Sequence, residues 1–181
     1  AIAGVALHAI PVSSHTLDEY LAVQQRFPAP LVPPYRTATV LMGTGCPHSC
    51  FFCQSPVEFR NDSRQVLLRD PQSAAGEIAW LVREHGADAV FALQPNLVLA
   101  HLLEVYEALD ARGVRGLPIA GFVRAADVAR AGRDGLLGPL VDAGVRVLSL
   151  GLDIPYVTRE DRYGKEFDFS TMDEAVALCT R

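Results

Sequence analysis

The sequence alternates short apolar strands with amphipathic helices, and this alternation restricts the fold more than any other feature. Residues 37–42, 88–93, 118–123 and 146–152 read as buried strands because they are apolar and partly β-branched. Repeated strand–helix units predict a parallel sheet, with Gly86, Gly113 and Gly144 at the helix ends. The apolar helix positions are Ala74, Ile78, Leu81 and Val82, then Leu99, Leu102, Leu103, Tyr106 and Leu109, then Leu136, Leu137, Leu140 and Val141, and last Met172, Ala175, Val176 and Cys179.

The strand spacing is uneven in an informative way. The later strands begin 30 and 28 residues apart, at positions 88, 118 and 146, whereas the first interval is about 50 residues. The extra residues follow the first of these strands directly. Four strand–helix units are half of what a closed eight-fold barrel needs. We therefore expect an open sheet or a barrel that continues beyond Arg181.

The region before residue 37 has a different character. Residues 2–7, "IAGVAL", predict a short strand, and we interpret 1–10 as the tail of an upstream domain. Prolines at 28, 30, 33 and 34 make 11–36 a linker, because proline lacks the N–H donor that a sheet needs. The core domain is then 37–181.

Composition excludes several classes of protein. Half of the 181 residues are hydrophobic and 20% are charged, as in ordinary globular domains. The net charge of −5 and the lack of a Lys/Arg run argue against nucleic acid or an anionic membrane as a partner. There is no apolar run of about 18 residues and no basic segment at the start. We expect a cytoplasmic protein.

Three of the four cysteines lie in one loop, "GTGCPHSCFFCQ" (43–54), directly after the strand at 37–42. Cys46, Cys50 and Cys53 have the spacing C-x3-C-x2-C. In parallel βα folds ligands bind at the C-terminal ends of strands, so the thiolates are expected at the mouth of the sheet. Iron–sulfur clusters and structural zinc usually take four protein ligands. Three leave one position for a substrate or water. The alternatives are a zinc site completed by His48, or a disulfide with a spare thiol.

The loop resembles the cysteine motif of the radical S-adenosylmethionine (SAM) superfamily, in which an aromatic residue, here Phe52, precedes the last cysteine. Four further segments are similar to the cobalamin-binding members: "RDPQSAAGEIAWLVREHGADAVFAL" (69–93), "GFVRAADV" (121–128), "LLGPLVDAGVRVLSLGLDI" (136–154) and "YGK" (163–165). The resemblance covers most of the chain, and the cysteine loop is its specific part. The strand at 2–7 with its proline-rich linker is similar to the junction after their cobalamin domain.

The resemblance implies a fold and a set of cofactors. The fold is a partial (β/α)6 TIM-like barrel of parallel strands, with the cluster loop after the first strand. Cys46, Cys50 and Cys53 would bind three irons of a [4Fe–4S] cluster, and SAM would chelate the fourth iron. Cobalamin is a further cofactor in the subclass that binds it.

The resemblance also suggests contacts for SAM. Phe52 would pack beside its adenine, although packing of the loop onto the core is the alternative. Arg124, at the end of the strand at 118–123, would fork onto its carboxylate, with a surface ion pair as the alternative. Asp153 would accept a ribose hydroxyl or a substrate donor, or else cap a helix. Lys165 is a further candidate near the site.

Two positions depart from the family pattern. Many members have acidic residues after the second core strand, where this chain has Leu93, Gln94, Pro95 and Asn96, and Glu where it has Asp153. Outside the loop, Cys179 falls on an apolar stripe, which predicts a core cysteine. His101, near a helix start, is a weak candidate for reaching the mouth.

The expected reaction begins when the reduced cluster gives SAM one electron, which yields a 5′-deoxyadenosyl radical that abstracts hydrogen from a substrate. The leading expectation is cobalamin-dependent methyl transfer to an unactivated carbon. Rearrangement, cyclisation or methylthiolation are alternatives within the family, and a non-catalytic zinc-binding module is the alternative from another class. Expected partners are a small-molecule or peptide substrate and a one-electron reductant of flavodoxin or ferredoxin type, with neither nucleic acid nor membrane.

Overall fold

The core of the molecule is a four-stranded parallel sheet. The structure is a computed structural model that describes residues 18–19, 21–22, 36–48, 50, 53, 65–151 and 169–180. Its strands are β1 (Thr37–Leu41), β4 (Ala89–Leu93), β5 (Ile119–Val123) and β6 (Val145–Leu150). They lie in the order β1-β4-β5-β6, so neighbours in the sheet are also successive along the chain.

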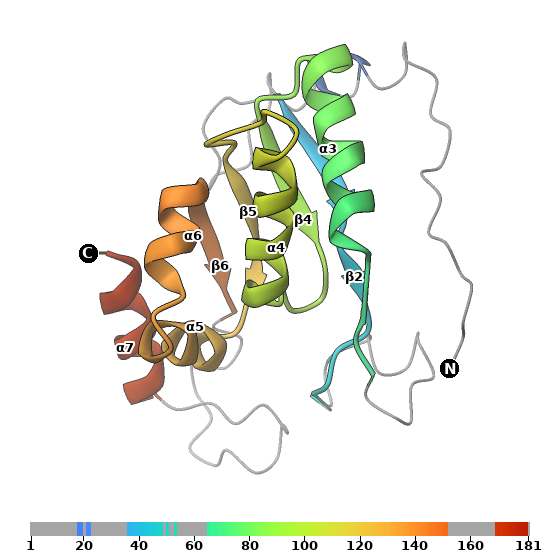
Figure 1. Cartoon of the computed structure of the whole chain (residues 1–181). Helices are drawn as coiled ribbons and strands as arrows, with labels where there is room; N and C mark the ends of the chain where they lie inside the picture. Colours follow the sequence, from blue (N-terminus) through green and yellow to red (C-terminus); the bar gives the residue numbers. More distant parts are fainter. Residues whose placement is uncertain are drawn as a thin grey trace.

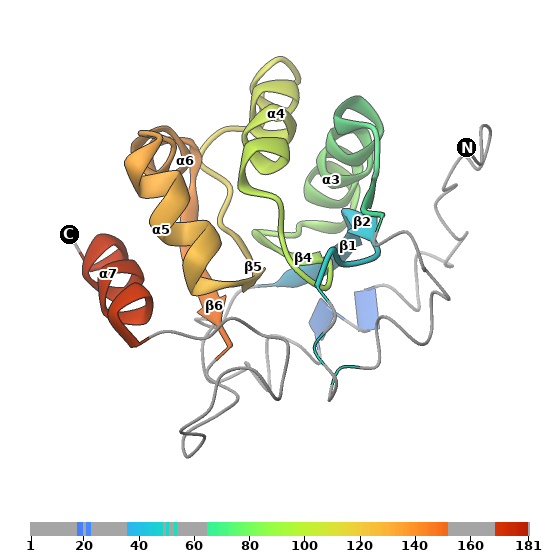
Figure 2. The same ribbon diagram turned by 90° about the horizontal axis from the view of Figure 1, so that it is seen from below.

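Helices cover one face of this sheet (Figures 1 and 2). They are α3 (Pro71–His85), α4 (Leu99–Asp110), α5 (Ala125–Arg133), α6 (Leu137–Ala143) and α7 (Phe169–Cys179). A doubly wound sheet reverses its strand order and carries helices on both faces, whereas a barrel keeps sequential order with helices outside. The described sheet is therefore consistent with the expected partial barrel.

The first helix of the sheet domain begins and ends where its sequence dictates. Asp70 is the N-cap of α3, and its carboxylate accepts the Ser73 N–H at 2.7 Å. Pro71 occupies the first helical position, where no N–H is needed. Gly86 ends the helix at φ +62°, a left-handed conformation that glycine adopts without strain.

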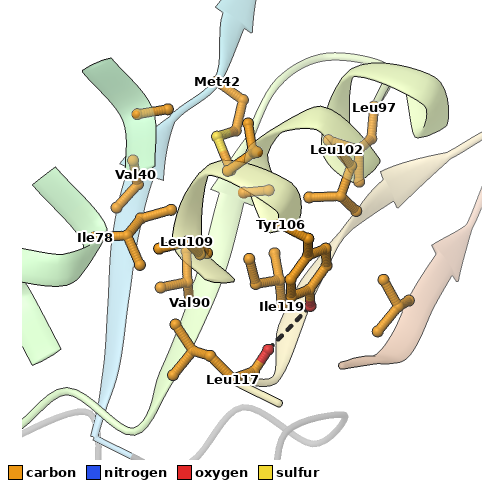
Figure 3. Close-up of a cluster of buried hydrophobic side chains, with 14 of the residues drawn as sticks. Val40, Met42, Ile78, Val90, Leu97, Leu102, Tyr106, Leu109, Leu117 and Ile119 are labelled. Atoms are coloured by element: carbon orange, nitrogen blue, oxygen red, sulfur yellow. Dashed lines mark hydrogen bonds between the residues drawn. The ribbon is translucent and has the colours of Figure 1, made fainter. Parts of the chain in front are cut away.

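The hydrophobic core lies between the sheet and the helices (Figure 3). Val40 of β1 and Val90 of β4 contribute its sheet side, and Ile78 and Leu102 its helix side, each at most 1% exposed. Tyr106 of α4 lies in the same cluster, and its hydroxyl donates a 2.9 Å hydrogen bond to the Leu117 carbonyl. This bond satisfies the one polar atom that the tyrosine brings into the core.

The sheet face opposite the helices is apolar but less covered. Leu93 and Phe122, near the C-terminal ends of β4 and β5, are 46% and 52% exposed. The rings of Phe122 and Phe91 meet edge to face with their centroids 5.4 Å apart. In a barrel this face would line the interior.

The four core strands are confirmed within two residues at each end. The expected strand at 2–7 lies outside the described residues. In the expected linker, Leu21 is fully buried, and Asp18 lies 3.3 Å from His85 and 3.4 Å from Arg36, so this part of the linker docks on the core. No helix among the residues described is long and apolar enough to cross a membrane.

One helix was not predicted from the sequence, and one expectation about a helix face was wrong. The segment at 125–133 forms α5 although its small apolar side chains gave no periodic signal. Cys179 is exposed instead of buried, because α7 turns Ala175 toward the core and Val176 away from it. Leu178 packs so closely on α5 that a Cβ at Gly132 would lie 2.6 Å from it. The α7 stripe is therefore rotated relative to the predicted one.

Candidate functional site

The cysteine loop leaves the sheet and returns to it through a closed neck. Strands β2 (Gly43–Thr44) and β3 (Leu67–Leu68) pair antiparallel, so the two ends of the loop lie side by side. Gly43 allows this approach, because a Cβ there would lie 2.7 Å from the Leu67 carbonyl oxygen. The loop at 45–66 is thus tied at its base.

Backbone hydrogen bonds fix this neck to the mouth of the sheet. The Met42 N–H donates to the Leu93 carbonyl at 3.0 Å, and the Arg69 N–H donates to the Met42 carbonyl at 2.9 Å. His101 of α4 is buried, and its Nε2 lies 2.7 Å from the Arg69 carbonyl oxygen. Since a carbonyl only accepts, Nε2 carries the proton. His101 therefore lies at the mouth of the sheet and stabilises the neck through this hydrogen bond.

The Arg69 side chain is held as firmly as its backbone. It is 8% exposed and forms an ion pair with Glu77, and its Nε lies 3.2 Å from the Ser73 hydroxyl. These residues belong to the segment at 69–93 that is similar to cobalamin-binding radical SAM proteins. Arg69 and Glu77 thus join the end of the cysteine loop to α3.

The loop that carries the three cysteines follows the C-terminal end of β1 through the short strand β2. All three are free thiols with partly exposed side chains. The Cys53 N–H donates to the Cys50 carbonyl at 3.0 Å, which closes a turn between them. Gly45 has φ +81°, which reverses the chain just before Cys46. The fourth cysteine lies far along the chain on α7.

The chemistry of this donor set fits an iron–sulfur cluster. Three reduced thiols in one short loop are what such clusters bind, and the absence of a disulfide among them leaves each one available. In the part of the chain that the structure describes, no three Cys, His, Asp or Glu side chains lie close enough together to hold a metal ion. The fit therefore rests on the donors and their place at the mouth.

Arg124 is positioned by an indirect helix cap. It is the N-cap of α5, and its N–H donates to Asn96 Oδ1 at 3.0 Å. Asn96 Nδ2 in turn donates to Asp127 Oδ2 at 2.9 Å. In a capping box the third helical residue reaches the N-cap N–H itself. Here the Asn96 side chain links Asp127 to the Arg124 N–H. It therefore joins the turn after β4 to the start of α5.

The Arg124 side chain contacts the cysteine loop. Its Nη1 lies 2.6 Å from Nδ1 and 2.7 Å from Nε2 of His48, and both side chains are half-buried. A guanidinium has only donors, so the unprotonated ring nitrogen, which is the one a metal would bind, is the one that can accept from Nη1. This arrangement disfavours His48 as the fourth zinc ligand, and the fork of Arg124 onto SAM stays a prediction.

A cavity of about 470 Å³ borders the loop on the side of α5. Pro47 and His48 line it from the loop, the turn at 96–100 lines it from the end of β4, and Asp127 and Arg130 line it from α5. The contact between Arg124 and His48 thus lies at a junction of three elements. Sequence reasoning singled out Arg124 but missed Asn96 and the role of His48 as its contact.

The three other candidate residues share one outcome. Phe52, Asp153 and Lys165 lie outside the described residues. Gln94 follows β4 and is 1% exposed, yet neither atom of its amide has a partner among the described residues. Apolar periodicity and residue spacing in the sequence do not reveal a buried amide without hydrogen-bond partners.

Comparison with known proteins gives two relatives of one kind. The chain is 33% identical over 147 residues to an anaerobic magnesium-protoporphyrin IX monomethyl ester cyclase of Cereibacter sphaeroides, an alignment of 79% of this chain and 23% of the cyclase. It is 30% identical over 146 residues to the cyclase of the same name from Synechocystis, covering 79% of this chain and 28% of that protein. The chain is a homologue of these cyclases.

This relationship supports the resemblance to the radical SAM superfamily and agrees with the expected [4Fe–4S] cluster and SAM. No family model matches the chain. The chain spans about a quarter of the length of the two cyclases. Their names describe ring formation, so the expected methyl transfer gains no support from them.

Proposed function

We propose that this chain is part of a radical SAM enzyme that closes a ring on a small-molecule substrate under anaerobic conditions. The observation that carries the proposal is the cysteine loop, which carries three free thiols and whose two ends pair with each other just after β1. Homology to two anaerobic cyclases supports it independently. Cyclisation replaces methyl transfer as the leading reaction.

The residues of this chain have separate tasks in the proposal. Cys46, Cys50 and Cys53 would hold the cluster, with SAM on the remaining iron. Bound there, the cluster supplies one electron that cleaves SAM into methionine and a 5′-deoxyadenosyl radical. The neck at 43–44 and 67–68 fixes the loop against β4, so the thiols stay at the edge where a substrate can approach.

The apolar face of the sheet suits a large apolar substrate. Leu93 and Phe122 are about half exposed at the same edge as the cysteine loop. The names of the relatives specify a magnesium-protoporphyrin ester, which is a flat macrocycle with an apolar surface. We propose a substrate of this kind, with cobalamin and a flavodoxin- or ferredoxin-type reductant as the other components of the complete enzyme.

The products of SAM distinguish the two reactions. Methyl transfer from SAM leaves S-adenosylhomocysteine, whereas hydrogen abstraction leaves 5′-deoxyadenosine and methionine. The test is anaerobic reconstitution of the enzyme with iron, sulfide and cobalamin, followed by chromatography after addition of SAM, reductant and magnesium-protoporphyrin IX monomethyl ester. We expect 5′-deoxyadenosine without a matching amount of S-adenosylhomocysteine.

Equal amounts of the two nucleosides would favour methyl transfer over cyclisation. A colourless protein that retains zinc and forms neither nucleoside would support the zinc-binding module instead. The Cys46→Ala variant is the matched control, since it should form neither product while keeping the sheet intact.

A further inference from the structure

The starting observation is the contact between Arg124 and His48, which joins two segments 76 residues apart in the sequence. His48 lies between Cys46 and Cys50, in the half of the loop that precedes the turn at Cys50–Cys53. The neck holds the loop only at its base. The Arg124 guanidinium is thus a second point of attachment, at a residue that lies between two of the cysteines in the sequence.

The attachment is rigid on the side of the sheet. The backbone of Arg124 is fixed at the end of β5 by the 3.0 Å bond to Asn96, and Asn96 is fixed by Asp127. The Leu97 N–H also donates to the Phe122 carbonyl at 2.8 Å, which ties the same turn to β5. A side chain that starts from so fixed a backbone can define where its contact partner lies.

The nature of the contact favours a positioning role. The guanidinium is planar and can pack against an imidazole as well as donate to it, whereas an exposed ion pair contributes little. Nη1 is almost equidistant from the two ring nitrogens, and both side chains are half-buried. In either tautomer of His48, Nη1 is therefore within reach of the ring nitrogen that can accept a hydrogen bond.

We propose that Arg124 is a positioning residue that acts through His48 and holds the Cys46–Cys50 segment of the loop in its place at the mouth. The consequence for the cluster rests on the proposed function. The consequence for the loop does not, because both contacting side chains belong to this chain.

The test measures how readily each cysteine is alkylated. The full chain is freed of metal with a chelator, kept reduced under anaerobic conditions and treated with N-ethylmaleimide, and each modified cysteine is quantified by mass spectrometry. Arg124→Ala and His48→Ala should each raise the alkylation rates of Cys46 and Cys50 roughly fivefold, relative to Cys179 in the same sample. His48→Gln keeps an acceptor and should give an intermediate rate.

Matched controls separate this role from others. Arg133→Ala removes an arginine at the C-terminal end of α5 that pairs with Glu174 at 2.8 Å, and it should leave the rates of Cys46 and Cys50 unchanged. The double variant should react no faster than either single variant, since both remove one contact. Circular dichroism checks the fold, and Arg124→Lys, which retains the charge but not the planar group, should resemble Arg124→Ala.

Several results would overturn the proposal. Unchanged rates in both single variants would show that the contact does not hold the loop. Additive effects would show that the two residues act separately. Slower alkylation of Arg124→Ala would indicate that the cation acts on the thiols by its charge alone, since its loss lowers the thiolate fraction. Normal rates combined with weakened SAM binding would make Arg124 a SAM contact instead.

After reconstitution, a second readout connects the loop to the cluster. The EPR spectrum of reduced Arg124→Ala should be broader than that of the wild type, because a loosened loop gives a wider range of cluster environments. Failure of the wild-type protein to bind iron would contradict the proposed function, but the alkylation rates would still decide whether Arg124 positions the loop.

Discussion

Single thiols decide whether the loop can hold a cluster. We expect Cys46→Ala, Cys50→Ala and Cys53→Ala each to lose most of the bound iron after reconstitution, because two thiolates hold a cubane poorly. The measurement is iron per chain together with the absorbance near 400 nm. The three cysteines share one loop at the mouth of the sheet, so their effects should be alike.

Cys179→Ala is the matched control for these three variants. This cysteine is exposed on α7, and partial burial raises the pKa of its thiol. A raised pKa disfavours the thiolate, which is the form that binds metals. Iron content near that of the wild type is expected, and a large loss of iron from Cys179→Ala would contradict the assignment of ligands.

The buried amides after β4 give a contrasting pair. Gln94 has no partner among the described residues, so Gln94→Met should raise the free energy of unfolding by about 1 kcal/mol. Asn96 accepts a hydrogen bond from the Arg124 N–H and donates one to Asp127. Asn96→Leu should therefore lower the free energy of unfolding by about 2 kcal/mol. Urea denaturation measures both. A clear loss of stability in Gln94→Met would mean that its amide has a partner in solution.

For single residues, the sequence predicts which side chains could bind a metal better than it predicts which side chains contact one another. The cysteines could be found because their spacing is a property of the chain itself. His48 and Asn96 could not be assigned to Arg124, because their contacts depend on how successive strand ends come together in space. His101 was a weak candidate for the same reason, since only the fold places it against the Arg69 carbonyl.

At the scale of elements, the neck of the loop depends on one glycine. Gly43→Ala places a Cβ about 2.7 Å from the Leu67 carbonyl oxygen, so β2 and β3 must separate. We expect this variant to lose about 1–3 kcal/mol of stability and part of its iron. Thermal unfolding and iron analysis measure the two effects.

A second glycine supplies the control for this variant. Gly76 lies within α3, where an added Cβ meets nothing within 4 Å. Gly76→Ala should therefore gain about 0.5–1 kcal/mol from helix propensity and leave iron binding unchanged. Equal behaviour of the two variants would show that the neck has no part in holding the loop.

The packing of α4 on the sheet makes a prediction about pH. Burial raises the pKa of Tyr106 above its usual value of 10.0, because the ionised phenol loses its hydration in the core. Its contribution to stability is complete below pH 10.0 and is lost as the pH rises, since the unfolded chain gives up this proton first.

Tyr106→Phe separates the two roles of this side chain. It should cost about 1–2 kcal/mol at neutral pH, because the buried Leu117 carbonyl loses its donor. It should also fall less steeply in stability above pH 10.0 than the wild type does. Urea denaturation at neutral and alkaline pH measures both, and an equal decline in the two proteins would contradict the burial of this hydroxyl.

Elements with strong periodicity were predictable, and the others were not. The four strands and the buried faces of α3 and α4 follow from apolar patterns that are long enough to read. Helix α5 was not predicted because its buried residues are small: Val128, Ala129 and Ala131. The β2–β3 pair was not predicted because strands of two residues show no periodic pattern in the sequence. In α7 the exact face depended on packing against α5.

At the scale of the whole molecule, the sequential strand order places the ends of β1, β4 and β5 at one edge. The cysteine loop follows β1, the turn with Asn96 follows β4, and Arg124 follows β5. A sheet with another order would separate these groups. The alternation of strands and helices in the sequence implied this edge, whereas the neck and the attachment at His48 emerge only from the three-dimensional structure.

The central claim is that three thiolates of this chain bind a cluster whose remaining iron is open to SAM. EPR spectroscopy of the reduced, reconstituted wild-type protein tests it directly, with spectra recorded before and after saturating SAM. The account predicts the signal of a reduced [4Fe–4S] cluster that changes clearly when SAM is added, because SAM becomes a ligand of the iron itself. A cluster signal that SAM leaves unchanged, or no cluster signal at all, would contradict it.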